Sequence, residues 1–509
     1  MNAIELSLFA SRINAICEQM GTVLQQTAIS PNIRDRLDYS CAIFDIDGQL
    51  CAQAAHIPVH LGSMAYAMRD IVHQREWQEG DTVILNDPYQ GGTHLPDISF
   101  ISPVFVKGQL HAFVANRAHH ADIGADSPGS MPISKSIEEE GLIIPTTLIG
   151  KKNEIIDSVL NNLVSTLRNR DLSRADFKAQ FSVNQKGIVA LQDLIHQYQD
   201  DTFQGYLHSL NNYARKIAKQ SLSKVPHGDY EFSDVMDDDG LGKRDISIQC
   251  VISVRQDEIV CDFTGTSEQV IGNINCPISV TAAAVYYCFR CLMPEYTPNC
   301  AGSFDFIKIN VPKNNLLNAN YPAAVAAGNV ETSTRIVDVV FGALANALPD
   351  QVPAASHGSM NNIAMGADNW SYYETIGGGM GASKYNNGCD AIQTHMTNTL
   401  NTPIEVLEIN YPLLMKNYAI RASSGGTGMN HGGKGIIRHY KFLEKASVTL
   451  LTERRRHAPW GLANGGQGKP GVNSLNQQKL PAKTTLNVEI NDELTIETPG
   501  GGGYGEPEN

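Results

Sequence analysis

Two short segments of the chain carry histidine and carboxylate side chains at spacings that suit a metal site. The first, NDPYQGGTHLPD, contains His94 and ends at Asp97, and the second, NRAHHAD, contains the adjacent His119 and His120. Neutral imidazoles together with one carboxylate suit Zn, Mn or Fe(II), and three protein ligands leave positions open for water or a substrate. The two segments are therefore a candidate metal site, provided that the fold brings them together.

The stretch between the two segments has the composition of a β-hairpin that would do this. β-branched and aromatic residues dominate both sides of Lys107-Gly108, a dipeptide with turn chemistry. With the turn there, residues whose numbers add up to 215, the sum of 107 and 108, face each other. In that register Asp97 lies opposite Ala118, and His94 lies diagonal to His119. A bulge would shift this register, so the pattern predicts convergence of the strand ends and leaves open which of the two adjacent histidines is a ligand.

A simpler interpretation of the same residues is that they belong to loops, with the imidazoles bonded to backbone carbonyl groups. The spacing His-x-x-Asp is weak evidence for a metal by itself. The hairpin would bring the second histidine cluster close to the first segment. Before any resemblance is considered, this makes the metal interpretation about as strong as the interpretation as loop residues.

Size and composition describe a well-packed globular chain. It has 509 residues, of which 42% are hydrophobic and 18% charged, and this length suggests two or three domains. Its net charge of −14 argues against a nucleic-acid partner. No stretch approaches the roughly 18 apolar residues needed to span a membrane, and ten scattered cysteines do not form a disulfide framework. We therefore expect a reduced, cytoplasmic protein without a membrane segment.

Hydrophobic periodicity predicts an α+β fold, a large mixed architecture of several sheets with a helical segment in the middle and two intertwined lobes. Pro226-His-Gly228 ends the helical segment and is the best domain boundary. We expect an N-terminal lobe, residues 1–225, with the metal site, and a β-rich, glycine-punctuated lobe, residues 226–509. The expected elements are helices over residues 1–30, 62–75 and 155–223, strands within 41–60, 81–116, 246–254, 259–263 and 306–311, and a helix capped by Thr332 or Ser333 that stops at Pro349.

Other motifs with possible chemistry mostly fail on closer inspection. The loop GMNHGGK, which ends at Lys434, has phosphate-loop spacing, but Gly435 replaces the Ser or Thr that would hold magnesium, and a strand is expected next instead of a helix. The triple arginine at residues 454–456 is open to two interpretations, an anion clamp or a salt-bridge network. Glu331 lies where a helix is expected to begin, which favours a structural role over a catalytic one.

Several of these segments resemble the hydantoinase B/oxoprolinase family, and the resemblance runs in order from about Asn14 to the C-terminus. It identifies the whole chain as one unit of that family. The matching strings are NDPYQGGTHLPD, ANRAHHAD, GNVETS at 328–333, THMTN at 394–398, NTPIE at 401–405, LTERRR at 451–456 and TPGGGGYG at 498–505.

The resemblance implies an amidohydrolase that opens cyclic amides, such as 5-oxoproline or N-methylhydantoin, together with a hydantoinase A-type subunit. That partner would bind ATP and phosphorylate the small-molecule lactam, so ATP would not be bound by this chain. We expect a hetero-oligomer with two copies of each subunit. The alternatives are a subunit of an ATP-dependent ketone carboxylase, acting on acetone or acetophenone, and a non-catalytic scaffold for the ATP-binding subunit.

The resemblance also implies roles for individual residues. It assigns a divalent metal ion, Zn, Mn or Fe, to His94, Asp97 and His119. His120 and Asp122 then become neighbours that orient the ligands, and either is a candidate catalytic base. Arg117 is the third candidate catalytic residue, and either its charge or that of Arg454 to Arg456 is expected near the phosphate of the activated substrate.

Overall fold

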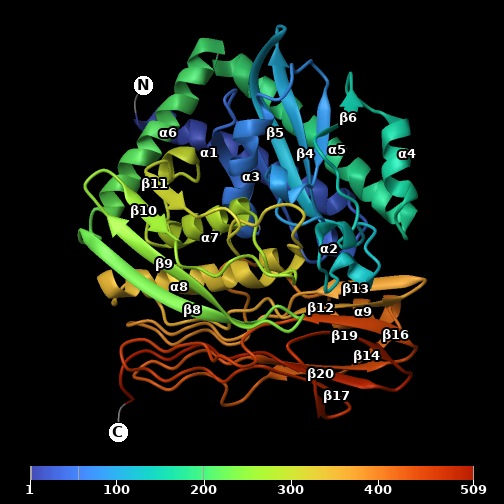
Figure 1. Cartoon of the computed structure of the whole chain (residues 1–509). Coiled ribbons are helices and arrows are strands. Elements are labelled where there is room, and N and C mark those ends of the chain that lie inside the picture. Colours follow the sequence, from blue (N-terminus) through green and yellow to red (C-terminus); the bar gives the residue numbers. More distant parts are fainter. Residues whose placement is uncertain (1–2, 56, 199, 508–509) are drawn as a thin grey trace. The chain divides into compact units, whose positions relative to one another are not determined.

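The computed structural model describes residues 3–55, 57–198 and 200–507 (Figure 1). These residues form nine α-helices and four β-sheets, which confirms the predicted α+β class. The chain divides into two compact units whose segments alternate along the sequence. These units are defined by contacts and not by independent folding, so the predicted domain boundary between residues 225 and 226 stays a prediction. Unit 1 consists of Met1–Gly124, Leu142–Lys224 and Phe289–Lys308, and unit 2 consists of Ala125–Gly141, Val225–Cys288 and Ile309–Asn509.

Unit 1 is built on a seven-stranded antiparallel sheet with the strand order β2-β1-β5-β4-β3-β6-β7. Its strands are β1 (Tyr39–Phe44), β2 (Leu50–Ala55), β3 (Thr82–Leu85), β4 (Asp97–Val106), β5 (Gln109–His119), β6 (Thr147–Lys151) and β7 (Glu154–Ile155). Its helices are α1 (Ala3–Thr27), α2 (Pro31–Arg34), α3 (Val59–Ile71), α4 (Asp157–Ser165), α5 (Arg170–Tyr198) and α6 (Asp200–Leu222).

Both faces of this sheet are buried, so its central strands are apolar on both sides. Val114 and Ala118 of β5 enter a core shared with α1, α5 and α6. Phe113 and Ala115, which point the other way because side chains alternate along a strand, enter a second core under α3. Every odd-numbered residue in the last part of β5 therefore faces α3.

The β4–β5 hairpin turns at Lys107-Gly108, as predicted, with φ of 53° and 76° at these two residues. The two pairs next to the turn follow the predicted register, but a β-bulge at His111 shifts every later pair by one residue. Asp97 is consequently paired with His119. The prediction that it lies opposite Ala118 was wrong, because one extra residue in a strand leaves no clear mark in the sequence.

Unit 2 contains three sheets. In the first, β11-β10-β9-β8, strands β8 and β9 carry helix α8, and the other two, β13-β12-β16-β19 and β14-β15-β20-β17-β18, share one apolar core between them (Figure 1). The strands are β8 (Gly228–Asp238), β9 (Arg244–Val254), β10 (Ile259–Asp262), β11 (Ile307–Asn310), β12 (Asn362–Ala367), β13 (Trp370–Glu374), β14 (Leu413–Ile420), β15 (Ile436–Phe442), β16 (Ala446–Leu451), β17 (Val472–Leu475), β18 (Gln478–Lys479), β19 (Lys483–Val488) and β20 (Glu493–Glu497). The helices are α7 (Ile278–Cys291), α8 (Ser333–Ala347) and α9 (Ile404–Asn410).

Two local expectations in unit 2 have different outcomes. A strand, β15, follows Gly435, as expected for a loop that is not a phosphate loop. The predicted cap of α8 was wrong, because a π-helical turn, Gly328–Thr332, continues the helix upstream. The Thr332 hydroxyl donates instead to the carbonyl oxygen of Ile274. None of the helices in the described part of the chain combines the length and apolar character that crossing a bilayer requires.

Glycine-rich segments of unit 2 pack backbone against backbone. A methyl group on Gly379 or Gly433 would lie 1.9 Å from a backbone oxygen of a neighbouring segment, and one on Gly501 would lie 2.1 Å from such an oxygen. These distances are far below contact distance. Side chains are therefore excluded from these positions by the packing.

We expect Gly433→Ala to lower the free energy of unfolding by about 1 to 3 kcal/mol, the usual effect of overpacking. Gly205→Ala is the matched control, because Gly205 lies in α6 and, apart from the adjacent backbone of that helix, no heavy atom lies within 4 Å of the added methyl group. It should stabilise by up to about 1 kcal/mol, since Ala favours helix more than Gly does. Urea unfolding of both variants measures the difference, and equal stabilities would contradict the backbone packing described above.

Candidate metal centre

His94, Asp97 and His119 come together in unit 1 at the open end of the hairpin. Asp97 Oδ1 lies 3.1 Å from His94 Nε2 and 3.1 Å from His119 Nδ1, and these two nitrogens lie 3.2 Å apart. All three side chains are buried. In the described part of the chain, they form the one group of three or more His, Cys, Asp or Glu residues whose ligand atoms all lie within 4.8 Å of one another.

The spacing of this donor triangle fits one divalent ion. Ligand atoms about 2.0–2.1 Å from an ion lie about 3.3 Å apart in a tetrahedral arrangement and about 2.9 Å apart in an octahedral one. The observed separations of 3.1 to 3.2 Å fall between these values. Two imidazoles and one carboxylate are also a donor set typical of catalytic zinc and non-haem iron sites with open positions. These three residues could therefore hold a metal ion.

The loop that carries His94 is fixed at both ends. The Asn86 side chain donates to the carbonyl oxygens of Leu95 and Leu142 and accepts from the backbone amide of Ile144. Gly91, with φ of 96°, brings the loop so close to α3 that a methyl group there would overlap Ala67. The position of His94 is thus determined by contacts of the loop on both sides.

Electrostatics favours an ionised Asp97 and a neutral His119, which are the protonation states that a metal requires of these two ligands. Burial by itself would raise the pKa of Asp97, but His94 and His60 nearby and hydrogen bonds from His119 and His60 hold it well below its usual range. Burial lowers the pKa of His119, although its hydrogen bond to Asp97 and the charge of Asp38 oppose this. A metal ion binds ionised carboxylates and neutral imidazoles, so these directions agree with the fit of the donor triangle.

Arg117 lies on the same face of β5 as His119, two residues earlier. Its Nε donates to Ser99 Oγ at 2.8 Å, its Nη1 to Ser63 Oγ at 2.6 Å, and its Nη2 to the Gly91 carbonyl oxygen at 3.3 Å. Burial lowers the pKa of Arg117 to about 10, against the opposing effect of the Asp97 charge. All of its hydrogen-bond partners among the described residues are neutral, and the charged group that acts on it is the nearby Asp97 carboxylate.

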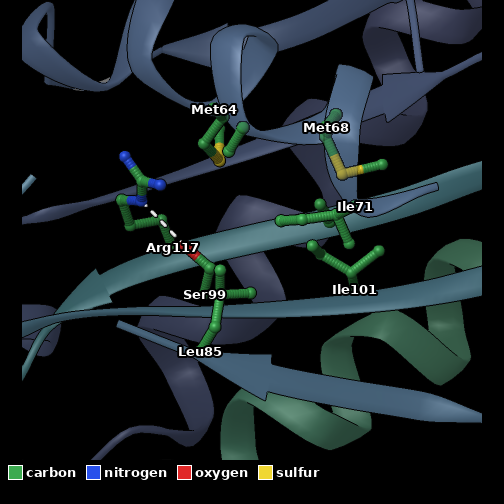
Figure 2. A pocket seen from close by; sticks show the side chains of 9 residues that line it. Met64, Met68, Ile71, Leu85, Ser99, Ile101 and Arg117 are labelled. Carbon is green, nitrogen blue, oxygen red and sulfur yellow. Dashed lines mark hydrogen bonds between the residues drawn. The ribbon is translucent and has the colours of Figure 1, made fainter. Parts of the chain in front are cut away.

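A small apolar cavity of about 10 Å³ lies beside Arg117, between α3 and the sheet. Figure 2 shows Arg117 bonded to Ser99 at one end, with Met64 and Met68 of α3 across from the strands. A cavity of this size has about the volume of one water molecule. The lining residues are Met64, Ala67, Met68, Ile71, Leu85, Ser99, Ile101, Ala115 and Arg117.

His120 and Asp122 do not join the donor triangle. His120 Nε2 lies 2.7 Å from Gln180 Oε1, and its ring stacks on Phe177 of α5, so it belongs to the face of the hairpin opposite His119. The carboxylate of Asp122 accepts from the backbone amides of Gly124 and Arg168 and fixes the loop after β5. Their predicted role as catalytic base stays a prediction, and these contacts favour a supporting role.

His60 also contacts the centre, although no sequence motif singled it out. It lies in the first turn of α3, and its Nε2 is 3.3 Å from Asp97 Oδ2. Its Nδ1 is 3.1 Å from Ser40 Oγ of β1. The sequence signal that could have pointed to His60 is its place in Pro-Val-His, at the start of a helix. Only the packing of α3 on the hairpin reveals which face of that helix meets Asp97.

The triple arginine lies in unit 2, and its first member is part of a salt-bridge network. Arg454 is buried and pairs with Asp234 at 2.7 Å and with Asp338 at 2.5 Å. Arg455 is also buried and bonds to the Asn361 and Asn473 side chains. The sequence left open an anion clamp and a salt-bridge network, and these contacts fit the salt-bridge network.

Comparison with known proteins agrees with this architecture. The chain matches the model of the Hydantoinase B/oxoprolinase family over residues 2–507, and it belongs to that family. It is 40% identical to 5-oxoprolinase 1 of Arabidopsis thaliana over 99% of this chain and 42% of that protein. It is 30% identical to the putative B-type subunit of a D-/L-hydantoinase from Pseudomonas sp. strain NS671, over 100% of this chain and 90% of that protein. The chain spans about two fifths of the length of the 5-oxoprolinases that it matches.

Two solved structures have the same fold. The ATP-dependent caprolactamase of Pseudomonas jessenii superimposes with a TM-score of 0.93 at 26% identity, over 99% of this chain and 91% of that chain. An acetone carboxylase in a nucleotide-free structure gives a TM-score of 0.89 at 17% identity, over 99% and 76%, and shows the fold alone. The resemblance identified from the sequence motifs is confirmed.

Proposed function

We propose that this chain is the B-type subunit of an ATP-dependent hydrolase of cyclic amides, which opens a ring activated by phosphorylation in a hydantoinase A-type partner. The observation that carries the proposal is the buried triangle of His94, Asp97 and His119, with donor atoms spaced for one divalent ion. The names of its relatives, which include 5-oxoprolinases, a putative hydantoinase and an ATP-dependent caprolactamase, support the substrate class.

Amide carbons resist water because resonance lowers their electrophilicity, so the reaction needs activation at both the carbon and the oxygen. His94 Nε2, Asp97 Oδ1 and His119 Nδ1 would hold Zn, Mn or Fe. Such an ion, when bound, polarises an oxygen and lowers the pKa of a bound water toward neutrality. Arg117 would attract the phosphate of the activated substrate, because its hydrogen-bond partners among the described residues are all neutral.

ATP chemistry is assigned to the partner. The glycine loop before β15 lacks both the magnesium-binding hydroxyl and the helix of a phosphate loop. This chain covers 42% of the length of the Arabidopsis 5-oxoprolinase, so the rest of that longer chain has room for an ATP-binding part. We propose that a separate subunit supplies that part here, in a cytoplasmic hetero-oligomer with two copies of each chain.

Metal analysis of the purified protein tests the site directly. We expect about one divalent ion per chain, because the described residues contain one donor triangle. Removal of the ion with a chelator should lower the melting temperature, since a ligand that binds only the folded state stabilises it, and addition of the ion should restore it. A chain that neither contains nor takes up a stoichiometric ion would identify the triangle as a hydrogen-bonded cluster and favour the scaffold alternative.

Assays with the cognate partner, ATP and a panel of lactams test the reaction. Ring opening coupled to ATP hydrolysis supports the proposal. The likeness in fold to an acetone carboxylase makes a ketone carboxylase subunit the second candidate. That activity would require bicarbonate and a ketone, so omission of bicarbonate distinguishes the two in the same experiment.

A further inference from the structure

The two oxygens of the Asp97 carboxylate have different neighbours. Oδ1 faces His94 and His119 in the donor triangle. Oδ2 accepts a hydrogen bond from Thr93 Oγ1 at 2.5 Å and lies 3.3 Å from His60 Nε2. Only one of the two oxygens therefore points toward the position of an ion, and the other is held by separate side chains.

His60 is itself held on its far side. Its Nδ1 lies 3.1 Å from Ser40 Oγ, and both His60 and Ser40 are buried. An ionised carboxylate only accepts hydrogen bonds, so His60 Nε2 must carry the proton that faces Asp97. In a neutral imidazole Nδ1 is then an acceptor, and the Ser40 hydroxyl can donate to it. The Asp97 carboxylate thus selects the tautomer, and the Ser40 hydroxyl holds the other ring nitrogen of His60.

The relay from Ser40 through His60 to Asp97 joins three separate elements of unit 1. Ser40 belongs to β1, where it pairs with Arg117 of β5. His60 belongs to α3, whose second turn contains Ser63, the hydroxyl partner of Arg117. Asp97 begins β4. Packing of α3 on the sheet therefore sets the position of the carboxylate.

We propose that His60 is a positioning residue of the metal centre, which orients Asp97 by binding Oδ2, with Ser40 holding Nδ1 of His60 and Thr93 donating to the same carboxylate oxygen. This inference rests on the proposed metal site. A carboxylate held in this way offers Oδ1 alone to an ion, which keeps coordination positions open for water and substrate. Partners that orient a ligand in this manner typically change metal affinity by about 10- to 100-fold when removed. His60 does not belong to the donor group itself.

The test uses cobalt as the probe, added to chelator-treated full-length protein. Its absorption spectrum reports coordination geometry, and a titration gives the dissociation constant. We expect His60→Leu to weaken cobalt binding by about 10- to 100-fold and to alter the spectrum at saturation. His60→Gln should recover part of both, because its amide group can donate to Oδ2. Ser40→Ala and Thr93→Val should give smaller changes in the same direction.

His111→Gln is the matched control. His111 is also a buried histidine of this hairpin, but it lies at the bulge near the other end, about 26 Å along the strand from His119. It should bind cobalt as the wild type does. Circular dichroism of each metal-free variant separates loss of folding from loss of binding, and if His60→Leu does not fold, the Ser40 and Thr93 variants decide.

The outcomes distinguish this inference from the proposed function. Absence of cobalt binding in the wild type would overturn the metal site and the inference together. If His60→Leu binds cobalt with the affinity and spectrum of the wild type, the positioning role is overturned while the metal site stands. If His60→Leu does not fold, the same result in both Ser40→Ala and Thr93→Val overturns the positioning role.

Discussion

Asp97→Asn is expected to abolish ring opening in the assembled enzyme while the partner retains part of its ATP hydrolysis. The substitution preserves the shape of the side chain but removes the only negative charge of the donor triangle. Loss of a ligand should exceed the roughly 10- to 100-fold effect of losing an outer partner. His94→Ala should have the same effect. Ring opening and phosphate release, measured on the same samples, give the two activities separately.

The control for this experiment is Asp70→Asn, which changes an exposed carboxylate of α3 in the same unit. It should leave both activities and the metal content unchanged. If Asp97→Asn and His94→Ala retained full ring opening together with ATP hydrolysis, the metal hypothesis would be wrong. Loss of metal without loss of ring opening would assign the ion a structural role only.

Glu331 should make the stability of unit 2 depend on pH. Burial raises its pKa to about 8, the hydrogen bond with Ser359 opposes this rise, and the nearby Glu453 adds to it. Its Oε1 accepts from the Met360 backbone amide and from the Asn362 side chain. The carboxyl group is therefore protonated in the folded protein at neutral pH, where an unfolded chain would ionise it.

The sign of the effect follows from proton linkage. Because the folded pKa is raised, this contribution to stability is fully present below the ordinary pKa of 4.5 and is lost as the pH rises to about 8. The loss amounts to about 1.4 kcal/mol for each pH unit in that window. Glu331→Gln stays neutral and keeps an acceptor oxygen, so its advantage over the wild type should grow from pH 5 to pH 8 and then level off.

Urea unfolding of the wild type and Glu331→Gln at several values of pH measures this difference. Exposed Glu154→Gln serves as the control and should follow the wild type at every pH. A constant difference between Glu331→Gln and the wild type across the window would show that Glu331 is ionised in the folded protein. The expected result would show that Glu331 is neutral in the folded protein, so stabilisation of a negative charge at the start of a helix would not be its role.

The sequence by itself determined the local features of this protein. The β-branched strands around Lys107-Gly108 specified the hairpin, because turn chemistry and strand preference depend on a few adjacent residues. Helical spacing indicated a helical segment over residues 155–223 for the same reason, and α4, α5 and α6 lie within it. The residue types at the outer ends of the two hairpin strands were sufficient to suggest His94 and Asp97 as ligands, and the family motifs selected His119.

Tertiary structure decided which side chains meet. The bulge at His111 changes the register by one residue, and in a strand that is enough to exchange the two faces, so it pairs Asp97 with His119. The same alternation turns His120 toward α5. His60 lies 37 residues before Asp97 and reaches it only because α3 packs on the sheet. Contacts of this kind depend on the packing of distant elements, and no local pattern in the sequence encodes them.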